Sequence, residues 1–262
     1  MHFYDSHNHL QDPALVPYQT MILKDCATGN VRKMVVNGTC EEDWAAVKAL
    51  AESHPTMIIP AYGLHPWRIR QRSTQWLTTL GQYLEESPAA VVGEIGLDRW
   101  INDYDIHDQL ETFTHQLQLA AELRRPVTIH CLKAWQLLHE QISALPALPK
   151  GFLLHSYGGS AEMIQPLAKL GGYFSISGYF AHPKKQRQHS ILQRIPLDRL
   201  LLETDAPAML PPKHLIKYPL NDETLNHPAN IARIYSFAAS ILDIDEAVLA
   251  QQVSENFNRL FH

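Results

Sequence analysis

The chain has 262 residues, 45% of them hydrophobic and 19% charged, which is normal for a globular protein, and we expect one domain spanning residues 1–262. A formal net charge of −5 argues against a broad basic surface for duplex nucleic acid. No apolar run is long enough for a membrane helix and Met1–Asp5 lacks a signal-peptide pattern, so we expect a cytoplasmic protein with no membrane partner.

Short apolar runs rich in β-branched residues alternate with longer segments of helical spacing. We predict eight strands, at Phe3–Ser6, Lys33–Asn37, Met57–Tyr62, Ala90–Ile95, Val127–His130, Gly151–Leu154, Tyr173–Ser177 and Leu200–Glu203. Most of these runs are continuously apolar, which favours parallel strands covered on both faces. We predict helices at Glu42–Ser53, Thr74–Glu86, His107–Arg124, Ala134–Leu145, Ala161–Leu170, Pro228–Leu242 and Glu246–Phe261, and a loop rich in Pro and Lys at Pro207–Pro219.

Eight strand-helix units in about 250 residues predict an α/β fold of the (β/α)₈ type, a single-domain TIM barrel. A doubly wound open sheet is the alternative, but the chain lacks the GxGxxG turn usual in that fold.

Cysteines and clustered cations give weaker signals. Cys26, Cys40 and Cys131 are an odd number without CxxC spacing, so we expect reduced thiols rather than disulfides or a zinc knuckle. Basic residues gather at Lys184–Arg187, near Arg194. They fit either a solvated helix face, which is the simpler interpretation, or a small positive rim.

Ionisable side chains follow directly on five of the predicted strands. They are His7 and His9 after the first, Glu94 in the fourth, His130 and His155 at the fifth and sixth, and Asp205 after the eighth. Residues two apart in a strand share a face, so His7 and His9 project together. Barrel enzymes place their chemistry at the carboxyl ends of the strands. Burying six such groups unpaired is costly, and a divalent cation compensates them, so we expect a metal site.

The ligand types indicate which metals fit. Four imidazoles and two carboxylates suit Zn²⁺, Mn²⁺, Fe²⁺ or Ni²⁺ better than Ca²⁺. Six ligands exceed the needs of one tetrahedral zinc and favour two divalent ions, with a carboxylate such as Glu94 as the bridge.

Six segments, read in order, together resemble one known family. They are Asp5-Ser-His7-Asn-His9, Gly63-Leu-His65-Pro66, Gly93-Glu94-Ile-Gly-Leu-Asp98, Pro126-Val-Thr-Ile-His130, His155-Ser156-Tyr-Gly-Gly-Ser160 and Glu203-Thr-Asp205-Ala-Pro207. Over essentially the whole chain they are similar to the TatD family of metal-dependent hydrolases, within the amidohydrolase-like superfamily.

The resemblance implies a Mg²⁺-assisted deoxyribonuclease with 3′ to 5′ exonuclease character, whose site also accepts zinc and manganese. It implies that His7, His9, Glu94 and Asp205 hold one metal, and that Glu94, His130 and His155 hold the second. It also implies that His65 contacts a phosphate and that Asp98 and Glu203 lie beside the ligands. We expect Asp205 and Glu94 to be catalytic, with Asp205 accepting a proton from the attacking water.

The chain departs from the family pattern around the substrate. The family carries arginine two residues after the fifth-strand histidine, where this chain has Leu132, and Lys133 is the neighbouring candidate for the positive charge. The family's Asn-Glu-Pro is Asn226-His227-Pro228 here, and Trp67 and Trp100 stand where other side chains are common. The metal ligands are preserved while the residues expected to meet the substrate differ.

Three functions therefore stay open. The leading one is phosphodiester hydrolysis on a DNA end or short single strand, with Trp67, Trp100 and Tyr157 as candidates for base stacking. The second is amide or ester hydrolysis of a small acyl substrate, as in a deacetylase or deacylase, because loss of the arginine matters less there. The third is a non-catalytic protein with structural metals. The sequence leaves the native metal and the oligomeric state open.

Overall fold

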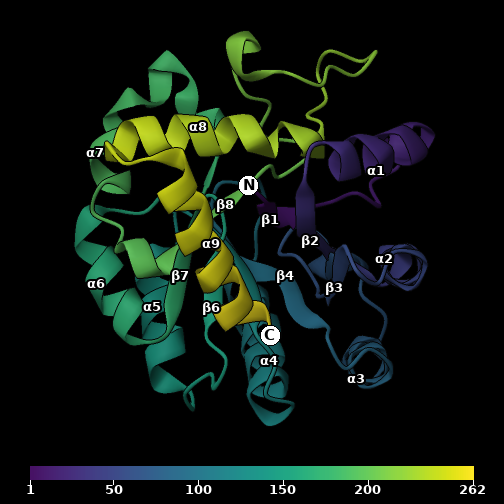
Figure 1. Ribbon diagram of the computed structural model, residues 1–262. Helices are drawn as coiled ribbons and strands as arrows, with labels where there is room; N and C mark the ends of the chain where they lie inside the picture. The colour runs from purple at the N-terminus through teal and green to yellow at the C-terminus, as the bar shows by residue number, and fades with distance from the viewer.

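Eight parallel strands form a closed barrel at the centre of the molecule (Figure 1). The structure is a computed structural model that describes residues 1–262. The strands are β1 (Phe3–Asn8), β2 (Val31–Asn37), β3 (Ile58–Tyr62), β4 (Val91–Asp98), β5 (Val127–Leu132), β6 (Phe152–Leu154), β7 (Gly172–Ser177) and β8 (Leu200–Glu203). Each pairs with the next in chain order. The predicted single-domain (β/α)₈ barrel is confirmed, and the open-sheet alternative is wrong.

The barrel closes where the last strand returns to the first. The Ser6 hydroxyl donates to the carbonyl of Leu202 at 3.0 Å. Just beyond β8, the N–H of Asp205 donates to the carbonyl of His7 at 2.9 Å, and the N–H of His9 donates to the carbonyl of Ala206 at 2.7 Å. These bonds hold the two chain segments that carry His7, His9 and Asp205 side by side.

Nine helices surround the strands. They are α1 (Gln19–Thr28), α2 (Glu41–Ser53), α3 (Trp76–Glu86), α4 (Ile106–Glu122), α5 (Trp135–Ala144), α6 (Ala161–Lys169), α7 (Gln186–Leu192), α8 (Ile231–Leu242) and α9 (Glu246–Phe261). Helix α1 was not predicted, and for α7 the sequence indicated only a solvated helix face at Lys184–Arg187. Helix α1 buries only Ile22 and Cys26, and the seven-residue α7 buries only Leu192, so neither carries a clear apolar stripe.

Helices α8 and α9 pack over β1 and β8, where the barrel closes (Figure 1). In α8 the buried residues Ile231, Ile234, Tyr235 and Ala238 fall on one face at helical spacing. The Tyr235 hydroxyl donates to the carbonyl of Tyr4 at 3.1 Å and accepts from its N–H at 3.0 Å. This pair of hydrogen bonds fastens α8 to the strand that carries His7.

The apolar strand runs form the core, as their sequence predicts. Phe152, Leu153 and Leu154 of β6 are completely buried. Strands β1, β4 and β5 extend beyond the predicted ends, to Asn8, Asp98 and Leu132. The predicted ends were Ser6, Ile95 and His130, and backbone pairing with the neighbouring strand continues for two or three residues beyond each. His7 therefore lies within a strand rather than in the loop after it, and Glu94 and His130 lie within strands as predicted.

The structure also places the cysteines and the basic cluster that the sequence singled out. None of the three cysteines is in a disulfide. The ammonium groups of Lys184 and Lys185 lie 4.9 and 5.1 Å from the centre of the Tyr179 ring, in the turn before α7. None of the helices combines the length and the apolar character that crossing a bilayer requires.

Candidate metal centre

The carboxylate of Glu94 is the centre of the candidate site. Glu94 lies in β4 and is only 2% exposed. Five imidazoles, from His7, His9, His65, His130 and His155, approach its two oxygens from separate strands and loops. The two oxygens face different sets of these imidazoles, so the site has two halves.

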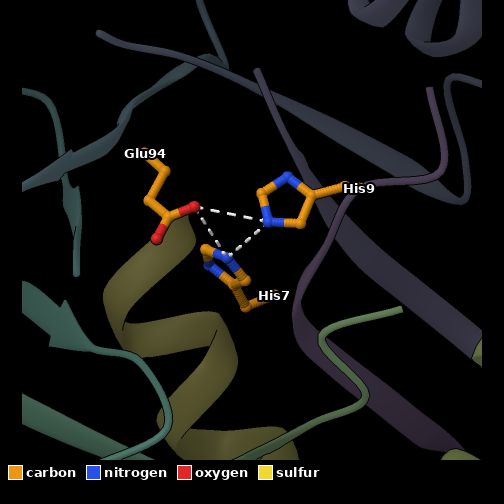
Figure 2. Close-up of side chains that lie close together, drawn as sticks. All are labelled: His7, His9 and Glu94. Atoms are coloured by element: carbon orange, nitrogen blue, oxygen red, sulfur yellow. Dashed lines mark hydrogen bonds and ion pairs between the residues drawn. The ribbon is translucent and has the colours of Figure 1, made fainter. Parts of the chain in front are cut away.

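The first half surrounds Oε2 of Glu94. The Nε2 atoms of His7 and His9 lie 3.4 and 3.3 Å from this oxygen, and 3.3 Å from each other. Figure 2 shows both rings directed at the carboxylate. Oδ1 of Asp205 completes the group, 3.6 Å from His7 and 3.5 Å from His9. These are the four residues that the sequence analysis assigned to one metal.

The second half surrounds Oε1 of Glu94. Nε2 of His155 lies 2.9 Å from this oxygen, Nδ1 of His130 at 3.3 Å and Nε2 of His65 at 3.4 Å. The two nitrogens of His130 and His155 that face Glu94 are 3.2 Å apart. His130 and His155 were expected here as ligands and His65 as a phosphate contact, and all three imidazoles lie against the same oxygen.

Close packing of two strands makes the second half possible. Gly96 separates Glu94 from Asp98 in β4 and has a φ of 149°. A Cβ at Gly96 would collide with the backbone carbonyl of His130 in β5. Only glycine therefore lets β4 and β5 approach closely enough to bring Glu94 and His130 together.

Asp205 is held by backbone geometry as well as by its neighbours. It follows β8 with a φ of 51°, in the left-handed region. Such a conformation costs a non-glycine residue roughly 1–2 kcal/mol, and functional sites often contain it. The hydrogen bond from its N–H to His7 fixes the turn. The residue as a whole is only 6% exposed.

Hydrogen-bond partners determine which imidazole nitrogens carry a free lone pair. Nδ1 of His9 lies 2.7 Å from the carbonyl oxygen of Asn37, and Nε2 of His130 lies 2.9 Å from Oδ2 of Asp98. Both partners only accept, so these nitrogens carry the hydrogens. The opposite nitrogen of each ring, which faces Glu94, is then the unprotonated one in the neutral ring. That is the form in which histidine ligates a metal.

His65 has the reverse arrangement. Its Nδ1 accepts a hydrogen bond from the backbone N–H of Trp67 at 3.1 Å. In the neutral ring the hydrogen therefore sits on Nε2, the nitrogen that faces Glu94. This histidine is prepared to donate a hydrogen bond rather than to ligate a cation, in agreement with its expected place beside the metal ligands.

The charges of the cluster are strongly coupled. Burial alone raises the pKa of Glu94, but the charges of His65, His155 and His7 together hold it well below its usual range. Burial alone lowers the pKa of His9, but hydrogen bonds to Asp205 and Glu94 raise it well above its usual range. Burial lowers the pKa of His65 to about 4. The carboxylates are thus ionised, and without a metal some imidazoles retain protons.

Burial and neighbouring charges also set the pKa values of the other side chains in the cluster. Burial lowers the pKa of His7, which the charge of His155 lowers further. Burial alone lowers the pKa of His155 and of His130, but their carboxylate neighbours raise both. Burial alone raises the pKa of Asp205, but the hydrogen bond from His9 and nearby imidazole charges lower it.

These residues fit divalent metal ions. Two pairs of imidazole nitrogens lie 3.2 to 3.3 Å apart without a carbonyl or carboxylate between them, and both pairs face one buried carboxylate. The side-chain ligand atoms fall into three groups, His7–His9–Glu94, His7–His155–Asp205 and His65–Glu94–His130, each with all atoms within 4.8 Å of one another. Imidazole nitrogens and carboxylate oxygens are the donors that zinc, manganese and iron prefer.

Two further carboxylates support the imidazoles, as the sequence analysis expected. Asp98 accepts hydrogen bonds from His130 and, at 2.7 Å, from the indole N–H of Trp67. Glu203 lies 3.5 Å from Nδ1 of His155 and accepts from the N–H and hydroxyl of Ser156 at 2.7 and 2.6 Å. The hydrogen bonds from His130 and Trp67 outweigh burial and lower the pKa of Asp98 to about 2.

Asp5 is a supporting residue to which the sequence analysis gave no role. It is completely buried in β1 and accepts from the N–H and hydroxyl of Thr204, at 2.9 and 2.6 Å, and from the Asn8 amide at 3.0 Å. It therefore ties the end of β1 to the end of β8. An acid two residues before His7 in an apolar strand was the available signal.

A cavity of about 650 Å³ opens onto the centre. His9, His65, Glu94, His130, His155 and Asp205 line it together with residues of the surrounding loops. Trp67 also lines it and is 56% exposed, whereas Trp100, which follows the end of β4, is 64% exposed and is not part of the lining. Tyr157 is 1% exposed and its hydroxyl donates to the carbonyl of Ser160, so it offers no face for stacking.

Leu132 faces the cavity, and Lys133 does not. Leu132 lines the cavity, at the position where the family pattern has arginine. Lys133 is not part of the lining, and its ammonium lies 3.9 Å from the centre of the Trp100 ring. His227, the other departure, is completely buried and its Nε2 lies 3.4 Å from Oδ2 of Asp25 in α1. It is likewise absent from the lining.

Comparison with known proteins identifies the family. The family model described as TatD related DNase matches residues 4–262. The uncharacterized metal-dependent hydrolase YjjV of Escherichia coli (strain K12) is 31% identical over 264 residues, covering 99% of this chain and 98% of that protein. The 3′-5′ ssDNA/RNA exonuclease TatD of Erwinia tasmaniensis is 31% identical over 246 residues, covering 92% of each chain.

Solved structures share the fold. The crystal structure of YjjV, a TatD homologue from Escherichia coli K12, aligns with a TM-score of 0.89 at 30% identity, covering 99% of this chain and 97% of that chain. A TatD family hydrolase from Entamoeba histolytica has the same fold, with a TM-score of 0.86 at 20% identity and coverage of 100% and 98%. The chain belongs to the TatD family of metal-dependent hydrolases, within the amidohydrolase-like superfamily.

Proposed function

We propose that this hydrolase cleaves phosphodiester bonds at a DNA end or in a short single strand, with two divalent metal ions. The observation that carries the proposal is that the two carboxylate oxygens of Glu94 face different pairs of imidazoles. Oε2 faces His7 and His9, and Oε1 faces His130 and His155. A carboxylate shared in this way suits a bridge between two ions, and paired ions are common in phosphodiester hydrolysis.

Each half of the site has a defined set of ligands in this proposal. His7, His9, Glu94 and Asp205 would hold one ion, and Glu94, His130 and His155 would hold the other. When bound, such ions acidify water to a pKa near neutrality and stabilise charge on phosphoryl oxygens. Zinc, manganese, magnesium, nickel and iron are all candidates, because the donors are imidazoles and carboxylates.

The side chains supply the proton transfer and the orientation. Asp205 accepts the proton of the attacking water, since its pKa is lowered and it is ionised at neutral pH. His65 donates a hydrogen bond from Nε2 to a phosphoryl oxygen, because its Nδ1 is held by the Trp67 N–H. Asp98 and Glu203 orient His130 and His155 through the nitrogens that face away from Glu94.

The surroundings support a single strand over a duplex. The net charge is −5, which disfavours a long polyanion. Trp67 offers an exposed indole at the cavity, and stacking of one base on such a ring contributes roughly 1 to 3 kcal/mol. The relative named 3′-5′ ssDNA/RNA exonuclease TatD supports the same substrate class.

One observation favours a second candidate, an amide or ester hydrolase acting on a small acyl substrate. Leu132 presents an apolar side chain to the cavity at the position where the family pattern has arginine. A neutral acyl group would pack against this side chain, whereas a phosphate would gain nothing from it. The deacetylase or deacylase alternative therefore shares the metal centre and differs in the bond that is cleaved.

The test compares substrates on one protein. Purified protein is stripped with a chelator, reloaded separately with Zn²⁺, Mn²⁺, Mg²⁺, Ni²⁺ or Fe²⁺, and given a labelled single-stranded oligonucleotide, bis(4-nitrophenyl) phosphate or 4-nitrophenyl acetate. The proposal expects metal-dependent cleavage of both phosphodiesters, with turnover strongly reduced in Asp205→Asn. Turnover of the acetate alone would establish the acyl alternative, and no turnover of any substrate would favour structural metals.

A further inference from the structure

The cavity beside the metal centre contains a single permanent cation. Of its 22 lining residues, only Arg68 is a lysine or arginine. Three carboxylates, Asp12, Glu42 and Asp43, line it outside the centre. A phosphate entering this space meets repulsion from the acidic residues and attraction from one side chain. Arg68 therefore defines where an anionic group is most favourably placed.

The guanidinium of Arg68 is free to bind a ligand. It is exposed and makes no ion pair or side-chain hydrogen bond. Two other arginines of the same segment are occupied. Arg72 pairs with both oxygens of Asp108, at 2.6 and 3.0 Å, and Arg70 donates to the carbonyl of Asp103. Of these three arginines, only the one at the cavity lacks a partner.

The backbone fixes Arg68 relative to the metal centre. Its N–H donates to the carbonyl of His65 at 2.8 Å, and the N–H of Trp67 donates to Nδ1 of the His65 ring at 3.1 Å. One tight turn thus positions both the imidazole that faces Glu94 and the arginine three residues later. The imidazole that would donate to a phosphate from Nε2 and the guanidinium of Arg68 therefore come from the same turn.

The other candidate cation is engaged elsewhere. The ammonium of Lys133 lies 3.9 Å from the centre of the Trp100 ring, and Lys133 does not line the cavity. Its neighbour Leu132, which does, has no charge. Neither Leu132, the last residue of β5, nor Lys133 therefore supplies positive charge inside the cavity.

We propose that Arg68 binds the substrate phosphate and makes the site selective for anionic phosphodiesters over neutral acyl compounds. The planar guanidinium donates two parallel hydrogen bonds to nonbridging phosphate oxygens. The inference rests on the proposed phosphodiesterase activity and assigns its substrate recognition to a residue from the loop after β3. It does not require Lys133 to move from Trp100.

The experiment uses metal-loaded full-length protein and three variants, Arg68→Gln, Arg68→Lys and the control Arg124→Gln. Arg124 is exposed, lies outside the cavity lining and loses the same charge. The substrate is the 4-nitrophenyl ester of thymidine 5′-monophosphate, and binding of thymidine 5′-monophosphate itself is measured by calorimetry. The acetate ester serves as the neutral comparison.

We expect Arg68→Gln to raise KM for the phosphodiester and Kd for thymidine 5′-monophosphate roughly 10- to 100-fold, the range of charge-assisted hydrogen bonds, with little change in kcat. Arg68→Lys should recover part of both losses, because it restores charge without the fork. Arg124→Gln and any acetate hydrolysis should be unaffected. An unchanged KM and Kd in Arg68→Gln, or equal losses in Arg124→Gln, would overturn the assignment. A wild type that binds the nucleotide through Arg68 but never cleaves a phosphodiester would refute the proposed function instead.

Discussion

Asp98→Asn tests how the carboxylates behind the imidazoles control the metal centre. Oδ2 of Asp98 accepts from His130 at 2.9 Å and from Trp67 at 2.7 Å, and Oδ1 accepts from the Trp100 N–H at 2.6 Å. Asparagine keeps only one accepting oxygen, so its NH₂ must face at least one of these donors. The substitution preserves shape and burial and changes only the hydrogen bonding.

The size of the effect follows from the same contacts. The hydrogen bonds from His130 and Trp67 outweigh burial and lower the pKa of Asp98 from 3.8 to about 2. That shift corresponds to about 2 kcal/mol in favour of the carboxylate. Loss of such a partner typically weakens metal binding 10- to 100-fold, or about 1.4 to 2.7 kcal/mol. We therefore expect one of two metal equivalents, that of the His130 half, to bind more weakly by this factor.

The assay is competition for Zn²⁺ against a chromogenic chelator, with metal content measured after dialysis. Asp108→Asn is the matched control, because Asp108 pairs with Arg72 away from the centre. The reasoning fails if Asp98→Asn binds both equivalents as the wild type does, or if the control loses affinity equally. Lower activity with unchanged affinity would also refute it, because Asp98 would then not act through His130.

Three further predictions address catalysis, metal removal and pH. Asp205→Asn should lower turnover by roughly 10²- to 10⁴-fold, the usual contribution of a general base, while the circular dichroism spectrum stays near that of the wild type; near-normal turnover would exclude this role. Stripping the metals should lower the melting temperature, and Zn²⁺ at a hundred times its Kd should restore about 2.7 kcal/mol of stability; a melting temperature insensitive to both treatments would contradict a metal centre. Burial lowers the pKa of His227 to about 4 in the folded protein, against 6.5 unfolded, so its neutral form stabilises the fold above pH 6.5 and that stability is lost as the pH falls toward 4. Between pH 7.5 and pH 5.5, the free energy of unfolding measured with denaturant should fall by about 1 kcal/mol more in the wild type than in His227→Asn. If the free energies of the two proteins fall in parallel with pH, this histidine is not buried in its neutral form.

Local sequence determined the strands and most helices. Continuous apolar runs such as Leu200–Glu203 predicted buried parallel strands, and their alternation with helical spacing predicted the barrel, because period and burial are local properties of a chain. Polar residues at the strand ends, such as Glu94 and His130, were visible for the same reason. Helix α1 was missed, and α7 was indicated only by the basic residues of a solvated helix face, because the few buried residues of these helices leave little periodic signal.

Only the tertiary structure decided how the side chains of the site divide their work. The sequence shows which histidines are present, but the ring nitrogen that faces away from Glu94 has its partner in another strand or loop. That partner is Asn37 for His9 and Asp98 for His130. The role of Asp5 became visible once β1 and β8 were adjacent. The unpaired Arg68 could be recognised only when the cavity and every neighbouring carboxylate had positions. These features depend on contacts between distant segments, which barrel closure creates and which no local pattern records.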